Sequence, residues 1–429
     1  MNLEKTRNPK YLKLLFIVPT LFGSDGGVIN EREMAKALGK KVKCMYVISF
    51  LDANKYLTRL KEVKKLENQL NGKLIVLPNL SPPPVNGLFA IINILFMYIN
   101  SLALTLMAVS LKKLGLVDAI YLRDPRIAIA FFSPRKIDVI TCVKFAGFYT
   151  QEIAKTMHIV ISNFVLDLFE RVNYIVVNKA DLLIVQSDLY KTTLQKLYGL
   201  PLGKNLLTIP AGINLEELPK RHNRLEKREA DKYRIGYIGS ASWWNGLDIL
   251  VNSMHIVQKT FPNAVLYINV GGGEFKAMNS LKGRIKKLGV RTVFSGPMSH
   301  AKALELMSTL DMLVVPRRRT LSTEFTIPIK VIEAFALGVP VIITRHKALE
   351  GEYKHGEDVL YVEPQPNDVA EKIIMLLYTP HLARKLSEKG FINSRKYDSN
   401  ALASRIAEAL FNLREDILNS SQQIKSIRS

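Results

Sequence analysis

The sequence predicts two α/β domains, each built on a parallel β-sheet that helices cover on both faces. Short runs rich in Val, Ile and Leu alternate with helix-length segments along the whole chain, a pattern typical of such sheets. The chain has 429 residues, which is more than a single hydrophobic core usually serves. With 48% hydrophobic and 23% charged residues, its composition is that of a globular protein.

Each predicted strand is a short apolar run followed by turn-forming or polar residues. In the first half the predicted strands are Leu14–Val18, Val42–Ile48, Leu74–Leu77, Ala119–Leu122, Val139–Val143, Leu182–Gln186 and Leu206–Ile209. In the second half they are Arg234–Ile238, Val265–Val270, Thr292–Ser295, Met312–Val315, Val339–Ile343 and Val359–Val362. Both halves are therefore expected to form Rossmann-like domains.

A polar, highly charged stretch separates the two sets of strands and is typical of an exposed linker. We therefore place an N-terminal domain at residues 1–215, the linker at 216–232 and a C-terminal domain at 233–395. Residues 396–429 form a final segment, apolar at helical spacing at first and then a polar tail that we expect to be frayed.

The charge balance narrows the range of partners. Lys and Arg outnumber Asp and Glu by 60 to 38, a formal net charge of +22, which favours nucleic acid, an anionic membrane or phosphorylated small molecules. Cys44 and Cys142 each lie in an apolar, strand-like run, which predicts reduced core residues and a cytoplasmic protein.

One segment has the length and apolarity of a membrane span. No charged residue occurs from Leu88 to Leu111, a stretch long enough to cross a bilayer. A crossing there would place strands of one sheet on opposite sides of the membrane. We therefore expect a helix that is buried or lies on a membrane surface.

Three glycine-rich turns follow predicted strands: Pro19–Gly27, Ile238–Ser240 and Val270–Glu274. Glycines let backbone N–H groups approach an anion, and a following helix adds a favourable dipole. One such turn alone is as often an ordinary connection as a phosphate site. Three of them would meet at the carboxyl ends of parallel strands, where doubly wound folds bind ligands.

The segment from Leu313 to Ile343 is the most informative part of the chain. It predicts a strand, a polar loop, a helix that begins at Pro328 and ends at Gly338, and another strand. Lys330 and Glu333 are three residues apart and share a helix face. A carboxylate there can bind a ribose diol while the lysine binds a phosphate.

These motifs resemble the retaining glycosyltransferases of family four, which have the GT-B fold of two Rossmann-like domains facing an interdomain cleft. The matching motifs, which extend over nearly the whole chain, are Ala180-Asp181 with Val185–Ser187, Pro210–Asn214, Tyr237–Gly239 with Asn245-Gly246, Gly271–Gly273, and Glu333-Ala334 with Gly338 and Pro340-Val341.

The resemblance implies transfer of a sugar, with retention, from a nucleoside diphosphate donor to a glycan or lipid-linked acceptor, without a metal or other cofactor. By this resemblance Glu333 binds the donor ribose, Gly26 and Gly27 approach the diphosphate, and Lys330 and Glu333 are the candidate catalytic residues. The full set of predicted donor-binding residues is Gly26, Gly27, Gly239, Ser240, Asn245, Gly272, Arg318, Phe325, Thr326, Ile327, Pro328, Lys330 and Glu333.

The chain departs from the family pattern where the family has its first glutamate and its basic pair. Phe325 stands at the glutamate position, with Glu324 beside it, and Ser240 and Asn245 replace an arginine and a lysine. The charge of a departing diphosphate must still be met. Lys330 and the run Arg317–Arg319, of which Arg318 is our candidate, are the available substitutes, although a charge run is as often a solvated loop.

A histidine that usually faces the sugar is also missing, because Cys142–Phe148 contains none. His158 is better explained as a core residue. His300, next to Ser299, could lie near the donor but is more simply explained as part of a helix start. Trp243 and Trp244 have the aromatic faces to stack on a sugar or base, but such pairs more often pack internally.

The acceptor side should be the N-terminal domain, and the charge together with the Leu88–Leu111 stretch suggests that it rests on an anionic membrane at its cytoplasmic face. Two other classes remain open. A non-catalytic relative that binds sugar nucleotides or glycans would bind the donor without turnover. A nucleic-acid-binding protein ranks last, since the chain lacks the clustered basic and aromatic pattern of such modules.

Overall fold

The computed structural model describes residues 11–22, 26–79, 88–132, 137–145, 159–201, 203–219, 232–272 and 275–428. By contacts the chain divides into two compact units. The first comprises Met1–Gly23, Glu31–Pro210 and Asn400–Ser429, and the second comprises Ser24–Asn30 and Ala211–Ser399. Most of the predicted linker, residues 220–231, lies outside the described residues.

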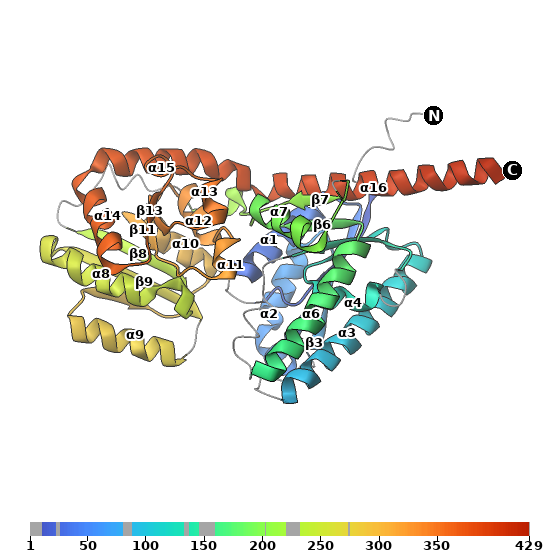
Figure 1. Cartoon of the computed structure of the whole chain (residues 1–429), viewed down its shortest axis with the longest axis horizontal. Coiled ribbons are helices and arrows are strands. Elements are labelled where there is room, and N and C mark those ends of the chain that lie inside the picture. The colour runs from blue at the N-terminus through green and yellow to red at the C-terminus, as the bar shows by residue number, and fades with distance from the viewer. Residues whose placement is uncertain are drawn as a thin grey trace. The chain divides into compact units, whose positions relative to one another are not determined.

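The first unit contains a seven-stranded parallel sheet in the order β3-β2-β1-β4-β5-β6-β7. Its strands are β1 (Lys13–Val18), β2 (Cys44–Asp52), β3 (Gly72–Asn79), β4 (Ala119–Leu122), β5 (Ile140–Lys144), β6 (Leu182–Val185) and β7 (Leu206–Thr208). Figure 1 labels three of these strands, β3, β6 and β7. β1, β4, β5 and β6 are buried almost throughout, as expected for strands covered on both faces.

The second unit contains a six-stranded parallel sheet in the order β10-β9-β8-β11-β12-β13. Its strands are β8 (Tyr233–Ser240), β9 (Ala264–Gly272), β10 (Thr292–Ser295), β11 (Met312–Val315), β12 (Val341–Thr344) and β13 (Leu360–Val362). The fold class predicted from the sequence is therefore confirmed, and every predicted strand is present with its ends shifted by a few residues at most.

The helices cover the sheets between consecutive strands. They are α1 (Gly26–Gly39), α2 (Ala53–Gln69), α3 (Leu88–Lys113), α4 (Pro125–Phe132), α6 (Ile159–Lys179), α7 (Asp188–Tyr198), α8 (Leu247–Thr260), α9 (Phe275–Leu288), α10 (His300–Ser308), α11 (Leu321–Glu324), α12 (Ile329–Ala336), α13 (Lys347–Glu350), α14 (Pro366–Tyr378), α15 (Pro380–Ser394) and α16 (Ser399–Arg428).

The C-terminal segment differs from its prediction in two respects. Helix α16 continues to Arg428, through the polar stretch that we expected to be frayed. Its apolar residues Leu402, Ile406 and Leu410 are buried in the first unit's core. The segment 396–429 that we set apart therefore contributes most of its length to the first unit.

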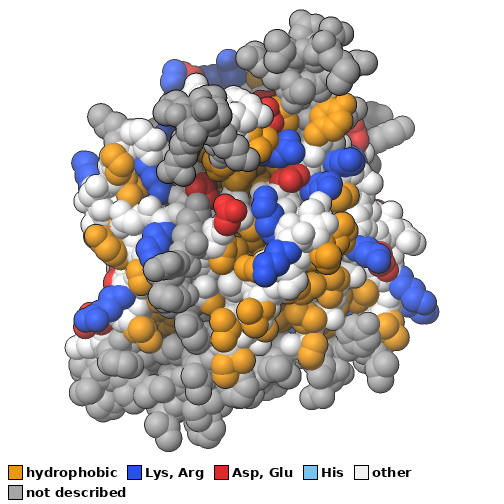
Figure 2. Space-filling model, turned by 90° about the vertical axis from the view of Figure 1, so that its right-hand side faces the viewer, with side chains coloured by type: hydrophobic (Ala, Val, Ile, Leu, Met, Phe, Trp, Pro, Cys, Tyr) orange, Lys and Arg blue, Asp and Glu red, His pale blue; other side chains and the backbone are white. Residues whose placement is uncertain are grey.

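Helix α3 has two faces of different character. Its inner face packs on α4, where Ser101 Oγ accepts a hydrogen bond from the backbone N–H of Ala130. Its outer face carries Ile99, Leu102 and Leu106, which are 50%, 45% and 62% exposed. Figure 2 shows a face of the molecule on which apolar side chains gather in the lower half, with Lys and Arg side chains above and beside them. No helix within the described residues is long and apolar enough to cross a membrane.

Candidate functional site

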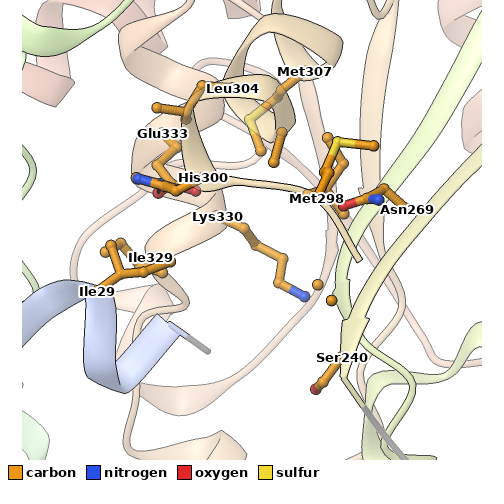
Figure 3. A pocket seen from close by; sticks show the side chains of 14 residues that line it. Ile29, Ser240, Asn269, Met298, His300, Leu304, Met307, Ile329, Lys330 and Glu333 are labelled. Carbon is orange, nitrogen blue, oxygen red and sulfur yellow. Dashed lines mark hydrogen bonds and ion pairs between the residues drawn. The ribbon is translucent and has the colours of Figure 1, made fainter. Parts of the chain in front are cut away.

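A pocket of about 250 Å³ opens in the second unit at the carboxyl ends of β8 and β9 (Figure 3). Because β8 lies between β9 and β11, the pocket is next to the point where the strand order reverses, the usual ligand position in doubly wound sheets. It is lined by Ile29, Ile238, Gly239, Ser240, Asn269, Gly271, Met298, His300, Ala303, Leu304, Met307, Ile329, Lys330 and Glu333.

The amine of Lys330 is held at the end of β8. It donates a hydrogen bond of 2.9 Å to the Tyr237 hydroxyl and lies 4.2 Å from the centre of that ring. Gly239 has φ +148°, and a Cβ at this position would overlap the lysine amine. Only glycine therefore lets the amine approach the end of the strand.

Burial dominates the electrostatics of Lys330. Burial and, to a smaller extent, the guanidinium of Arg317 lower the pKa of the amine to about 7, against the opposing charge of Glu333. A lysine in this state changes its charge in the physiological range. It can therefore take up a proton when an anion enters the pocket.

Glu333 lies one turn further along α12 and is 5% exposed. Its Oε1 is 2.6 Å from His300 Nε2, which comes from the first residue of α10, after the N-cap Ser299. Figure 3 shows Lys330 and Glu333 extending from one helix into the pocket, with His300 beside the carboxylate. His300 thus begins a helix, as we expected, and its side chain also lines the pocket.

The other wall of the pocket is mostly apolar, and we did not anticipate it from the sequence. It consists of side chains of Ile29, Met298, Leu304, Met307 and Ile329. An apolar wall facing a few polar groups is the usual composition of a small-molecule site. Nothing in the local sequence distinguishes these residues from core residues, since their common position comes from the fold.

Asn269 is the one buried polar side chain of β9 in the pocket lining, at 2% exposed. Its Nδ2 donates a hydrogen bond of 2.7 Å to the carbonyl of Gly296. This bond fixes the loop that carries Met298 into the pocket wall. An asparagine inside an apolar strand, between Ile268 and Val270, was the available sequence signal.

Ser240 and Asn245 do not carry the charge of the residues they replace in the resembling family. Asn245 is buried, and its Nδ2 donates hydrogen bonds to the Ser240 carbonyl and hydroxyl, at 3.1 and 3.0 Å. Gly246 follows with φ +69°, and a Cβ there would overlap the carbonyl of Pro316. Asn245 therefore shapes the turn after β8, while Ser240 lines the pocket.

The remaining predicted donor residues lie outside the lining of this pocket. Gly26 and Gly27 form the first turn of α1, and Gly272 ends β9. Thr326 bonds to the Ser322 carbonyl, Ile327 is buried and Pro328 is the N-cap of α12. Phe325 caps the end of α11. Their predicted contacts with a donor stay predictions.

Arg318 does not line this pocket, and its predicted contact with a donor stays a prediction. Its guanidinium donates two hydrogen bonds to the carboxylate of Asp248, at 2.9 and 2.7 Å, and a third of 2.7 Å to the carbonyl of Trp243. These contacts belong to a second hollow of the same unit. Of the two substitutes for the missing basic pair, the structure brings Lys330 to the pocket and takes Arg318 elsewhere.

Glu324, which is next to the position of the family's first glutamate, has its carboxylate bonded outside this pocket. Its Oε2 accepts a hydrogen bond of 2.9 Å from the backbone N–H of Lys347 at the start of α13. Its Oε1 is 3.8 Å from Arg319 Nε. The carboxylate therefore secures the loop between β12 and α13 and is absent from the pocket lining.

In the first unit, Lys144 ends β5 within the stretch where the family has its histidine. The amine is fully buried and donates a hydrogen bond of 2.7 Å to Glu31 Oε1. The Tyr121 hydroxyl donates to the other oxygen of Glu31 at 3.3 Å. Residues 146–158, including His158, lie outside the described residues.

Comparison with known proteins supports a glycosyltransferase. Residues 232–379 match the family model of glycosyl transferases group 1. Mannosylfructose-phosphate synthase of Agrobacterium fabrum is 25% identical over 216 residues, which are 46% of this chain and 45% of that protein. The chain thus matches less than half the length of this curated relative.

The whole fold is shared with solved structures. Sucrose-phosphate synthase of Thermosynechococcus elongatus has a TM-score of 0.73 at 17% identity, covering 95% of this chain and 100% of that chain. The Anabaena protein HepE in complex with UDP-glucose has a TM-score of 0.66 at 18% identity, covering 93% and 99%. At these identities the likeness shows the common fold.

Proposed function

We propose that the protein is a retaining, metal-independent glycosyltransferase that takes its sugar from a nucleoside diphosphate donor and binds that donor in the pocket of the second unit. The observation that carries the proposal is the placement of Lys330 and Glu333. One helix directs a cation and a carboxylate into a single pocket, inside the region that matches the glycosyltransferase family model.

The two side chains suit different parts of the donor. The Glu333 carboxylate can accept hydrogen bonds from two ribose hydroxyls, since only its Oε1 bonds to His300. The Lys330 amine, at the end of β8, can neutralise the negative charge that develops on the departing diphosphate. At about 250 Å³ the pocket is below the usual 300–1,000 Å³ of sites for drug-sized ligands. It would therefore hold only part of a nucleotide sugar.

A panel of UDP-, GDP- and ADP-sugars tests this proposal by thermal shift. A ligand at 100 times its Kd stabilises the folded state by about 2.7 kcal/mol, a shift of roughly 5–10 °C for a unit of this size. We expect one nucleotide class to give such a shift, and we expect Glu333→Ala to abolish it. Glu371→Ala, on the exposed surface of α14, should leave it unchanged.

The same panel separates the proposal from its alternative. The protein could be stabilised by one nucleotide class and still release no nucleoside diphosphate in the presence of glycan acceptors. That result would favour a non-catalytic binding relative. The observation that motivates this alternative is Phe325 at the position of the family's first glutamate. No shift with any donor, in folded protein, would contradict the glycosyltransferase and favour a degenerate relative that binds glycans without a nucleotide sugar.

For the acceptor, we propose a lipid-linked glycan at an anionic membrane surface. The outer face of α3 presents Ile99, Leu102 and Leu106 one turn apart, and Lys112 and Lys113 follow in its last turn. An apolar helix face bordered by lysines is the composition that binds at the interface of an anionic bilayer.

Vesicle flotation tests the membrane surface. We expect the protein to float with vesicles of phosphatidylcholine and phosphatidylserine at low salt, and the variant Leu102→Ser/Leu106→Ser to bind at least tenfold less. Leu197→Ser, which changes a leucine of α7 that is 55% exposed, is the matched control. Equal flotation of all three proteins would remove α3 from the membrane contact.

A further inference from the structure

The second unit has another hollow, of about 350 Å³, which the donor pocket does not include. It is lined by Ala241, Ser242, Trp243, Leu247, Asp248, Ser280, Leu281, Arg284 and Arg318. Two of these residues, Trp243 and Arg318, were singled out in the sequence but have no part in the donor pocket. Any ligand contact of these two residues would therefore be made in the second hollow.

Part of the arrangement holds the local structure together. The bidentate bond of Arg318 to Asp248 and its bond to the Trp243 carbonyl fix the turn η4 (Trp243–Asn245) to α8. Burial raises the pKa of Asp248, but the hydrogen bonds and charge of Arg318 outweigh it, and the pKa is lowered overall. Asp248 is therefore ionised at neutral pH.

Two further side chains remain largely exposed at the hollow. The Trp243 ring packs edge-on against Trp244, with ring centroids 6.2 Å apart, and the Arg318 guanidinium lies 6.0 Å from its centre, yet most of the side chain stays accessible. The Trp243 side chain is 59% exposed at the rim of the hollow, although tryptophan is normally well buried. Arg284, on α9, is also exposed, and its hydrogen bond within the described residues goes to the neutral amide oxygen of Asn252 at 3.2 Å. The lining thus contains two guanidinium groups, of Arg284 and Arg318, and one carboxylate, of Asp248, so its net charge is positive.

These groups match one class of ligand. The flat, apolar face of an exposed indole stacks against the C–H face of a sugar ring, as aromatic side chains do where one side of a ligand is apolar and the other is hydrated. A guanidinium recognises a carboxylate or phosphate through paired N–H donors. We propose that this hollow binds a sugar unit carrying an anionic group, either a carboxylate or a phosphate, separately from the donor.

The site adjoins the donor pocket through one turn. Ser240 lines the donor pocket and Ser242 lines the second hollow, with their hydroxyl oxygens 3.2 Å apart. The variant that removes a ligand contact of the new site should therefore lie outside this turn. Arg284 meets that requirement, because it lies on α9 and outside the donor pocket.

Intrinsic fluorescence reports directly on the proposed site, because the chain has only two tryptophans, Trp243 and its neighbour Trp244. The full-length protein with Trp244→Phe keeps Trp243 as its single reporter. It would be titrated with glucuronate, glucose 6-phosphate, glucose, inorganic phosphate and UDP. We expect a saturable change with glucuronate or glucose 6-phosphate, and a Kd at least tenfold higher for glucose.

In the same background, Arg284→Gln should raise the Kd for the anionic sugar at least tenfold, while Arg291→Gln, an exposed arginine that does not line the hollow, should not. Whether glucuronate or glucose 6-phosphate binds more tightly distinguishes an acidic glycan from a sugar phosphate. Equal binding of glucose, equal binding of inorganic phosphate alone, or a response to UDP alone would each overturn the proposal.

Failure of this site and failure of the donor pocket are distinguishable. The thermal shift with a nucleotide sugar depends on Glu333 and should be unaffected by Arg284→Gln. The fluorescence response to an anionic sugar depends on Arg284 and should survive Glu333→Ala. A response that is lost in both variants would mean that the two hollows form one site, and the separate site would be rejected.

Discussion

Replacing Lys330 with methionine should weaken the binding of a nucleoside diphosphate about 10- to 100-fold at pH 7. A hydrogen bond to a charged group contributes about 1.5–3 kcal/mol, and Lys330 is the cation that reaches the pocket at the end of β8. The transfer rate should fall further, by roughly 10²–10³-fold, because charge on the leaving group is greatest in the transition state.

Binding of the diphosphate should weaken as the pH rises above 7, because Lys330 must carry a proton to bind it. The pKa of Lys330 is lowered to about 7, chiefly by burial, so the amine is mostly neutral at pH 8 in the empty pocket. A bound diphosphate raises that pKa and draws a proton onto the amine. Above pH 7.5 the phosphate groups are already ionised, and the Kd should rise about tenfold for each pH unit if only the ammonium form binds.

Calorimetric titration in two buffers with different ionisation enthalpies measures the proton directly. We expect uptake of close to one proton at pH 8 in the wild type and none in Lys330→Met, whose weaker binding should not change between pH 7.5 and 9. The variant should remain folded, since methionine fills the space of the lysine stem without a buried amine. Identical pH profiles in the two proteins would show that another group binds the diphosphate.

The strands and the Lys330–Glu333 pair were predictable because both depend on local spacing. An apolar run bounded by glycine or polar residues has few alternatives to a buried strand, and residues three apart share a helix face wherever the helix lies. Pro328 and Gly338 marked the ends of that helix in the sequence, and Gly338 has the φ of +68° that favours glycine.

The other parts of the site depend on contacts between distant segments. His300 and Glu333 are 33 residues apart, and neither neighbourhood indicates the other. The sequence offered Lys330 and the run Arg317–Arg319 as cations for the diphosphate and could not choose between them. The tertiary structure places Lys330 in the pocket lining and pairs Arg318 with Asp248, which is 70 residues away in the sequence. The apolar wall of the pocket has the composition of a core.

Loss of folding stability at low pH should come chiefly from His346, at the N-cap of α13. Its ring is fully buried, and among the described residues neither ring nitrogen has a hydrogen-bond partner. Nδ1 is 3.5 Å from Glu324 Oε1, which is too long for a hydrogen bond. Burial, followed by the charges of Arg317 and Arg319, lowers the pKa of His346 to about 3.

The sign of the effect follows from proton binding in the two states. Between pH 3 and about 6.5 the unfolded chain carries a proton on this histidine and the folded chain does not. Protonation of His346 in the unfolded chain therefore leaves the free energy of unfolding unchanged above pH 6.5. Below that pH it decreases the free energy of unfolding by about 1.4 kcal/mol for each pH unit. His355, whose pKa is also lowered by burial, contributes with the same sign.

His346→Leu should lower that slope by the contribution of His346, about 1.4 kcal/mol for each pH unit, because leucine fills the buried space and binds no proton. Urea unfolding at pH 7, 6 and 5, followed by the fluorescence of Trp243 and Trp244 in the same unit, measures it. At pH 7 the variant should be as stable as the wild type or more stable, since the two ring nitrogens it loses have no partner to leave behind. His381→Gln, exposed on α15, should keep the wild-type slope. If His346→Leu keeps the wild-type slope, another group causes the loss of stability at low pH, and the assignment to His346 is wrong.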